Sequence, residues 1–335
     1  MLETLIAFVT LISLIVYALM GGADFGGGFW DLCARGPRAA RQRSLIADAI
    51  APIWEANHVW LILVIVLLFT AFPVAFAAMM NALHLPLFAM LVGIVLRGSA
   101  FVFRKYGDKH DAAQRRWGVV FGVSSVFTPF FQGLCLGALA GGAIRAEAGQ
   151  VVTGFFAGWT TGFAVACGVF AVALFAFLAA VYLTVDAAAD REVQDDFRRR
   201  ALGAELALAP IAAAVFFAAR NGGALEMHAG LTRWWAPLLL AATSAAALTA
   251  LGALWTRRFR VARAAAIAQV TLILVGWSAA QFPHLVVPDI DIFDAAAPEI
   301  TLQLLVIALA AGAFILLPSL YYLFHIFKRG QPSEE

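Results

Sequence analysis

Long runs of apolar residues, separated by short polar connections, repeat along the whole chain. A helix needs about 20 mainly apolar residues to cross the hydrocarbon core of a bilayer. Nine stretches come close to this length, so the pattern predicts an all-α integral membrane protein with about nine transmembrane helices. The predicted spans are residues 5–25, 50–72, 75–103, 117–139, 155–182, 202–219, 235–255, 264–282 and 301–327.

The composition supports a membrane protein. Hydrophobic residues make up 63% of the 335 residues, and charged residues only 13%. A soluble domain carries about 25% charged residues, and so large an apolar excess cannot be buried in one water-soluble core. We therefore expect a single membrane domain over residues 1–335, surrounded by the lipid bilayer. The net charge of +2 gives no reason to expect a nucleic-acid partner.

Lys and Arg are concentrated in alternate connections between the predicted spans. The odd-numbered connections and the carboxyl-terminal tail hold 19 of the 23 basic residues, whereas the even-numbered connections hold only Arg145, Arg220 and Arg233. Short cytoplasmic loops carry an excess of Lys and Arg. We therefore predict a multi-pass protein of the bacterial inner membrane, with a periplasmic amino terminus and a cytoplasmic carboxyl terminus.

A glycine-rich stretch, residues 21–28, surrounds Asp24 at the predicted cytoplasmic end of the first span. Ionisable groups in membrane segments are costly and are usually functional or paired. The alternative is an interfacial carboxylate that simply reaches water. A phosphate-binding loop is not indicated, because no strand precedes the glycines.

Several glycines have the GxxxG spacing that lets helix backbones approach closely within a bilayer. Ordinary glycine frequency in membrane helices explains any one pair equally well. The pairs are Gly22 and Gly26, Gly118 and Gly122, Gly133 and Gly137, and the series Gly154, Gly158 and Gly162.

Polar residues also open the predicted second span. Glu55 and His58 are three residues apart and share a helix face, and Asp48 lies seven residues before Glu55 on that face. If the helix starts at residue 50, Glu55 lies roughly 7 to 8 Å inside it. This depth suits a proton acceptor reached from the cytoplasm. The alternative is a structural carboxylate paired with Arg97, at a comparable depth in the third span.

The six histidines give no indication of a metal or haem site. No two of them have the i, i+3 or i, i+4 spacing that would place both on one helix face. A haem in a helix bundle usually takes axial ligands that face inward. His58 or His84 could serve only as a single ligand, so we predict no metal bound by this chain.

Short motifs along the whole chain carry a resemblance to a known family. They are Asp24-Phe25-Gly26, the run Pro52 to Trp60, Phe72-Pro73, Leu96-Arg97-Gly98, Phe103-Arg104, Phe282-Pro283, Asp294-Ala295-Ala296 and Thr301-Leu302. On these residues the chain resembles subunit II of the cytochrome bd-type quinol oxidases, a group that includes cyanide-insensitive oxidases. Length, helix number and orientation agree with this resemblance.

The resemblance implies a fold of two four-helix bundles plus one additional helix. It also implies a terminal oxidase, in which quinol is oxidised, oxygen is reduced to water and the protons come from the cytoplasm. The haem-bearing subunit I would carry two haems b and one haem d, and this chain would bind none. A bound quinone and a small accessory membrane subunit remain open.

The resemblance implies roles for Asp24, Glu55, Trp54, Asn57 and Trp60, and the spacing and depth argued above add Asp48, His58 and Arg97. The proton path would run through Glu55, Asp24, Asp48 and His58; the motif near oxygen access would be Trp54, Asn57 and Trp60; Arg97 would form a structural pair. Two positions depart from some members of the family, which have Asp in place of Glu55 and Gln in place of His58.

Two other functions compete with an oxidase subunit. A secondary transporter would need unwound helices and polar residues near the midplane of the bilayer, whereas the ionisable groups here cluster towards the predicted cytoplasmic end. In a purely structural scaffold, Asp24 and Glu55 would only pair with Arg97.

Overall fold

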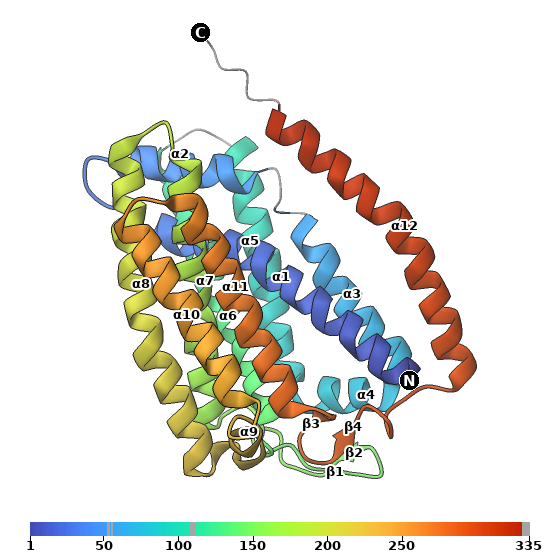
Figure 1. Cartoon of the computed structure of the whole chain (residues 1–335). Helices are drawn as coiled ribbons and strands as arrows, with labels where there is room; N and C mark the ends of the chain where they lie inside the picture. The colour runs from blue at the N-terminus through green and yellow to red at the C-terminus, as the bar shows by residue number, and fades with distance from the viewer. Residues whose placement is uncertain (52–53, 55, 107–110, 330–335) are drawn as a thin grey trace.

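The computed structural model describes residues 1–51, 54, 56–106 and 111–329. It is an array of helices with two small β-hairpins at one end (Figure 1). The helices are α1 (Leu2–Cys33), α2 (Ala39–Ile50), α3 (Ala56–Ala71), α4 (Pro73–Ala82), α5 (His84–Tyr106), α6 (Asp111–Ala140), α7 (Gly162–Asp186), α8 (Arg191–Ala218), α9 (Leu225–Gly230), α10 (Ala236–Trp255), α11 (Phe259–Gln281) and α12 (Glu299–Arg329).

Short elements complete the fold. A π-helical turn, Ala219–Gly223, extends α8. The strands β1 (Ala146–Glu147) and β2 (Gln150–Val151) form one antiparallel hairpin, and β3 (His284–Val286) and β4 (Ile290–Asp291) form the other. In the described residues, eight helices are long and apolar enough to cross a membrane, or up to nine when the bent pair α3–α4 counts as one span. The predicted all-α membrane fold is confirmed.

Two elements differ from the prediction. The first connection, expected to be a loop, contains the helix α2. The predicted third span, 75–103, is two helices: α4 is bent by 118° from α3 at Phe72, and α5 then returns through the bundle. Pro73 occupies the first turn of α4, where its missing N–H costs no hydrogen bond. The apolar sequence on both sides hides this bend.

Apart from the short helices α2, α4 and α9, the described helices form two groups of four and one outlier (Figure 1). The first group is α1, α3, α5 and α6, and the second is α7, α8, α10 and α11. Helix α7 packs along both α1 and α6 and joins the two groups. Helix α12 stands apart and touches α1 and α3 only over a short length. The arrangement confirms the expected two bundles plus one helix.

Glycines allow the closest of these contacts. A Cβ on Gly26 would lie 1.9 Å from the carbonyl oxygen of Phe175, and one on Gly133 would lie 2.4 Å from that of Cys167. Both contacts join α7 to the first group, as GxxxG spacing predicts. Gly118, in contrast, has open space around it.

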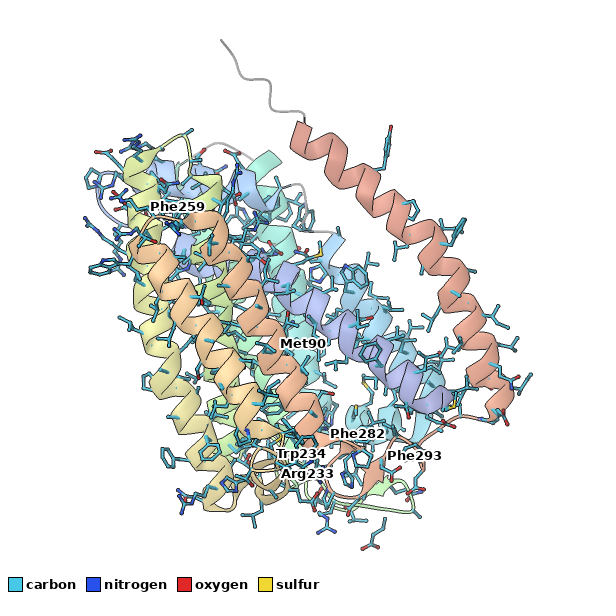
Figure 2. The ribbon with its side chains drawn as sticks, viewed as in Figure 1. Met90, Arg233, Trp234, Phe259, Phe282 and Phe293 are labelled. Atoms are coloured by element: carbon cyan, nitrogen blue, oxygen red, sulfur yellow. The ribbon has the colours of Figure 1, made fainter. Side chains whose placement is uncertain are left out.

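The chain's basic connections gather at one end of the helices. The connections α1–α2, α7–α8 and α10–α11 and the carboxyl end of α12 lie at the top of Figure 1, opposite the amino terminus, α4, α9 and both hairpins. Arg233, from an even-numbered connection, lies at the end opposite Phe259, which follows the arginines of the α10–α11 connection (Figure 2). We call the upper end the arginine-rich end.

Candidate functional site

Asp24 and Arg97 form an ion pair inside the first group. Asp24 lies nine residues before α1 ends at Cys33, which puts it about 13 Å inside that end. Both residues are 1% exposed. Arg97 Nη2, on α5, donates to Asp24 Oδ1 at 2.5 Å and to the Asp24 carbonyl oxygen at 3.3 Å. This burial excludes the interpretation of Asp24 as an interfacial carboxylate.

The Arg97 guanidinium is also held by α6. Its Nε donates to Ser125 Oγ at 3.1 Å, and Ser125 Oγ donates to the carbonyl oxygen of Phe121 at 2.7 Å. The guanidinium carbon lies 4.8 Å from the centre of the Phe25 ring and 4.9 Å from that of Phe121. A Cβ on Gly28 would lie 2.0 Å from Ser125 Oγ, so only glycine lets α6 approach here. Arg97, on α5, is therefore held in place by contacts with both α1 and α6.

Helix α3 adds two polar side chains beside this pair. Asn57 is 0% exposed, and His58 is half-buried with its ring edge-to-face against Phe25 at 6.4 Å. In the part of the chain that the structure describes, Asp24 Oδ2 and both polar atoms of the Asn57 amide have no hydrogen-bond partner. Such buried groups usually bind water or another polar group.

A second ion pair lies one step nearer the arginine-rich end. Arg104 binds both carboxylate oxygens of Asp31, at 2.9 and 3.0 Å, and Asp31 is 3% exposed. Each partner is seven residues from its counterpart in the first pair, a rise of about 10 Å. A cavity of about 220 Å³ borders this pair and is also lined by Asp48, on α2, and Gln114. Asp48 therefore meets Asp31 and Arg104 at the same cavity.

Polar contacts continue in the other direction along α1. Gln132 Nε2, on α6, donates to the hydroxyl of Tyr17, which is 3% exposed. Tyr17, Asp24 and Asp31 are spaced by seven residues and lie on one face of α1. They form a buried polar face about 21 Å long. This length is most of the roughly 30 Å hydrocarbon core.

Glu55, the central residue of the predicted proton path, lies outside the described residues. The structure does change the argument about its depth. Residue 50 ends α2 and α3 begins at Ala56, so residue 50 is not the start of the helix that follows Glu55. Asp48 consequently lies on a different helix from His58, and the inference that a single helix face runs from Asp48 to His58 was wrong. The described partner of Arg97 is Asp24.

Comparison with known proteins decides the family. The family model for cytochrome bd terminal oxidase subunit II matches residues 2–327. The chain belongs to this family. A stretch of 118 residues is 33% identical to cytochrome bd ubiquinol oxidase subunit 2 of Bacillus subtilis, covering 35% of this chain and 34% of the relative. A stretch of 132 residues is 30% identical to cytochrome bd-I ubiquinol oxidase subunit 2 of Escherichia coli K12, covering 39% and 34%.

The aligned stretches thus span about a third of these relatives. The fold likeness is more extensive. The structure of bd oxidase from Geobacillus thermodenitrificans matches with a TM-score of 0.77 at 22% identity, over 98% of this chain and 99% of that chain. The whole chain therefore has the fold of a bd oxidase subunit, as the motifs predicted.

The motif residues around Asn57 are partly buried. Trp54 packs against Phe101 with ring centres 5.5 Å apart, and its ring lies 3.4 Å from the position of a Cβ on Gly98. Trp60 packs against the apolar core between α1 and the second group. The motif thus places one indole ring before α3, at Trp54, and another on α3, at Trp60.

Two histidines were considered as single haem ligands. His58 lies in the first turn of α3, whereas His84 begins α5, after the length of α3 and α4. They cannot ligate the same iron from opposite sides. His84 Nδ1 is also hydrogen-bonded to the carbonyl oxygen of Asn81 at 2.8 Å. Among the described residues, no three His, Cys, Asp or Glu side chains are arranged to hold a metal ion.

Sequence reasoning missed the partners that complete the site: Asp31, Ser125, Tyr17 and Gln132. Arg104 was counted as a loop charge, but α5 continues through it to Tyr106. One signal was available in the sequence. Asp24 and Asp31 are seven residues apart on one helix, and Arg97 and Arg104 are seven residues apart on another. Such matched spacing indicates two ion pairs between the same two helices.

Proposed function

We propose that this chain acts as subunit II of a quinol:oxygen oxidoreductase, together with a haem-bearing subunit I in the inner membrane. Two quinols release four electrons and four protons, and the four electrons reduce one oxygen molecule to two waters with four protons taken up. The haems of the partner supply the electron-transfer chemistry. The family assignment supports this function, and it argues against the secondary transporter.

The proposed task of this chain is proton delivery from the cytoplasm. The arginine-rich end faces the cytoplasm under the positive-inside rule. Protons enter at the cavity beside Asp48, pass the Asp31–Arg104 pair and reach Asp24. Asn57, His58 and Glu55 continue the path towards subunit I. The observation that carries the proposal is the buried Asp24 carboxylate: among the described residues, one of its oxygens and both polar atoms of the Asn57 amide have no hydrogen-bond partner.

A charge-pair experiment separates a proton relay from a structural scaffold. Asp24→Asn and Arg97→Gln each leave a buried charge unmatched, so the assembly of both single variants should fall. The double variant removes both charges and keeps polar groups, so it should regain haem content and subunit yield. A relay predicts that quinol oxidase turnover stays low in this double variant. Recovery of turnover together with assembly would show that the pair is structural only.

The matched control for that experiment is a second Asp–Arg pair. Asp289 and Arg145 form a bidentate pair at 2.7 and 2.9 Å at the other end of the molecule. The double variant Asp289→Asn with Arg145→Gln makes the same chemical change away from the proposed path. It should keep normal turnover, which separates the loss of the path from the loss of any ion pair.

The proposed role of Glu55 in proton transfer requires a side chain that can ionise, and substitutions at this position test it. Glu55→Gln keeps the shape and hydrogen bonding but cannot ionise, so turnover should fall sharply with normal assembly. Glu55→Asp should retain much of the activity. A fully assembled Glu55→Gln oxidase that turns over at the wild-type rate would contradict this role.

The oxygen route is assigned to the motif side chains Trp54, Asn57 and Trp60. Trp60→Phe replaces an indole on the proposed route with a smaller aromatic ring. It should change the KM for oxygen more than kcat, whereas Asp24→Asn with Arg97→Gln should change mainly kcat. Equal oxygen KM values in wild type and Trp60→Phe would remove Trp60 from the route.

Orientation and haem content have direct tests. Reporter fusions after Arg38, Arg199 and Arg258 should all report the cytoplasm; one periplasmic signal would contradict the assigned topology.

The chain purified without subunit I should show no Soret band. A stoichiometric haem lost in His58→Ala or His84→Ala would overturn the assignment of the haems to the partner.

A further inference from the structure

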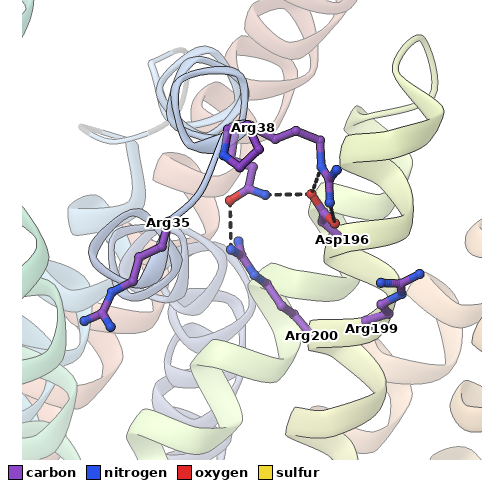
Figure 3. A pocket seen from close by; sticks show the side chains of 7 residues that line it. Arg35, Arg38, Asp196, Arg199 and Arg200 are labelled. Atoms are coloured by element: carbon purple, nitrogen blue, oxygen red, sulfur yellow. Dashed lines mark hydrogen bonds and ion pairs between the residues drawn. The ribbon is translucent and has the colours of Figure 1, made fainter.

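A polar cavity of about 280 Å³ opens at the arginine-rich end and shares no lining residue with the cavity beside Asp48. It lies where the end of α1, the start of α2 and the first turns of α8 meet (Figure 3). Four guanidinium groups line it against a single carboxylate. The charged and amide side chains are Arg35, Arg38, Gln42, Asp196, Arg199 and Arg200.

The single carboxylate is already used by the protein. Arg38 Nε and Nη2 donate to the two oxygens of Asp196 at 2.7 and 2.8 Å. Gln42 Nε2 donates to the same carboxylate at 2.7 Å. Asp196 therefore neutralises Arg38, and the remaining three arginines are left with no acid in the cavity.

Arg200 is fixed at this site and incompletely paired. Its guanidinium carbon lies 5.2 Å from the Trp30 ring centre and 5.1 Å from that of Phe197, and its Nη2 donates to Gln42 Oε1 at 2.8 Å. Its Nη1 is buried and has no acceptor among the described residues. A buried N–H of a cation without an acceptor is costly, so the geometry favours an external anion here.

Arg35 and Arg199 stand at the rim. Both are exposed, and neither forms a hydrogen bond or ion pair with another residue that the structure describes. In Figure 3 Arg35 and Arg199 lie on opposite sides of Arg200, and their side chains extend away from it. Flexible arginines on both sides of a fixed one can close on a tetrahedral anion with several N–H donors.

The position of the cavity favours a phosphate group. Arg198, Arg199 and Arg200 directly precede the apolar part of α8, and Trp30 belongs to the last turn of α1. Tryptophan and arginine at such positions mark the headgroup level of a bilayer. Arginine forks match phosphate oxygens, and basic pockets between membrane helices bind phospholipid headgroups. We infer that this cavity binds a phosphate group, from an anionic phospholipid headgroup or from a soluble phosphate.

The test uses the purified, delipidated two-subunit oxidase and measures binding by native mass spectrometry. The probes are phosphatidylglycerol, diacylglycerol without phosphate, and inorganic phosphate. The pocket variant is Arg35→Gln with Arg199→Gln. The control is Arg258→Gln with Arg260→Gln, which removes the same charge from exposed residues at the same end.

The pocket variant should bind phosphatidylglycerol roughly 30-fold more weakly than the control if the source is a lipid. Loss of inorganic phosphate binding alone would identify a soluble source. Arg200→Gln should weaken the same probe further. Equal binding by pocket and control variants, or equal competition by diacylglycerol and phosphatidylglycerol, would overturn the inference.

Discussion

Both groups bury a carboxylate deep among the helices, Asp24 in the first and Glu205 in the second, and these two carboxylates are satisfied differently. In the first group Asp24 meets the cation Arg97 at 2.5 Å. In the second group Glu205, on α8, accepts from the neutral amide of Gln269, on α11, at 2.9 Å. Asp24 is 1% exposed, and Glu205 and Gln269 are each 5% exposed. Burial is therefore similar, and the partner's charge is what differs.

This difference separates a charged site from a neutral one. A carboxylate held by a buried arginine keeps its charge, but the stability of the fold then depends on that arginine. An acid facing only an amide carries no compensating cation, and burial favours its neutral form. Glu205 Oε2 and Gln269 Oε1 both lack a partner among the described residues, and a protonated acid could donate between them. The proposed proton path accordingly belongs to the first group.

The largest expected effect is the loss of the cation in the first group. Arg97→Met should destabilise the assembled complex by about 3–5 kcal/mol, because Asp24 is then a buried charge without a partner. Adding Asp24→Leu should restore most of this loss, which thermal unfolding of the complex will measure. A stable Arg97→Met complex would mean that Asp24 is not charged, and the contrast with Glu205 would disappear.

The next effect tests the pair nearer the arginine-rich end. Asp31→Asn leaves Arg104, whose side chain is 21% exposed, without its carboxylate. Because Arg104 can still reach water, the loss should be smaller, about 1–3 kcal/mol. The melting temperature of the complex will rank it against Arg97→Met. A loss as large as that of Arg97→Met would place this pair in an equally dry environment.

Hydropathy was enough to predict most of the spans, because nine apolar runs leave few alternatives. It could not detect α2, whose arginines mask a short interfacial helix, or the bend at Phe72, where both sides are apolar. These features depend on packing against neighbouring helices. A window average of hydrophobicity contains no such information.

The site was predicted in residue types more than in pairing. The sequence identified Asp24, Asn57 and Arg97, but it offered both Glu55, at a similar assumed depth, and Asp24 as partners of Arg97 and could not choose between them. Depth along a helix follows from counting residues, whereas the facing direction depends on how α1 and α5 approach. Gly28 allows α6 to bring Ser125 close to α1 beside this pair, which periodicity alone could not reveal.

A smaller effect is expected for the exposed pair at the opposite end. Arg145 holds the pKa of Asp289 below its ordinary value, aided by the backbone N–H of Ala146. A carboxyl group whose pKa is lower in the folded state stabilises the fold at pH values above its unfolded pKa of about 3.9. This stabilisation is lost as the pH falls through the pKa of the folded state. Asp289→Asn should lower the melting temperature by about 1 °C at pH 6, because Arg145 is largely exposed. Near pH 3 the difference should shrink; an unchanged difference would exclude the linkage.

The smallest expected effect is at the neutral site. Glu205→Gln keeps the size and hydrogen bonds of a protonated acid, so it should change stability by less than about 0.5 kcal/mol and leave quinol oxidase turnover unchanged. Glu205→Leu is the control: it strips Gln269 of its partner inside the bilayer and should cost about 1–3 kcal/mol. Thermal unfolding of both complexes distinguishes hydrogen bonding from charge. If Glu205→Gln is as harmful as Glu205→Leu, the acid works in its ionised form. The second group would then hold a buried charge without a cation, and restricting the proton path to Asp24 and its neighbours would lose its physical basis.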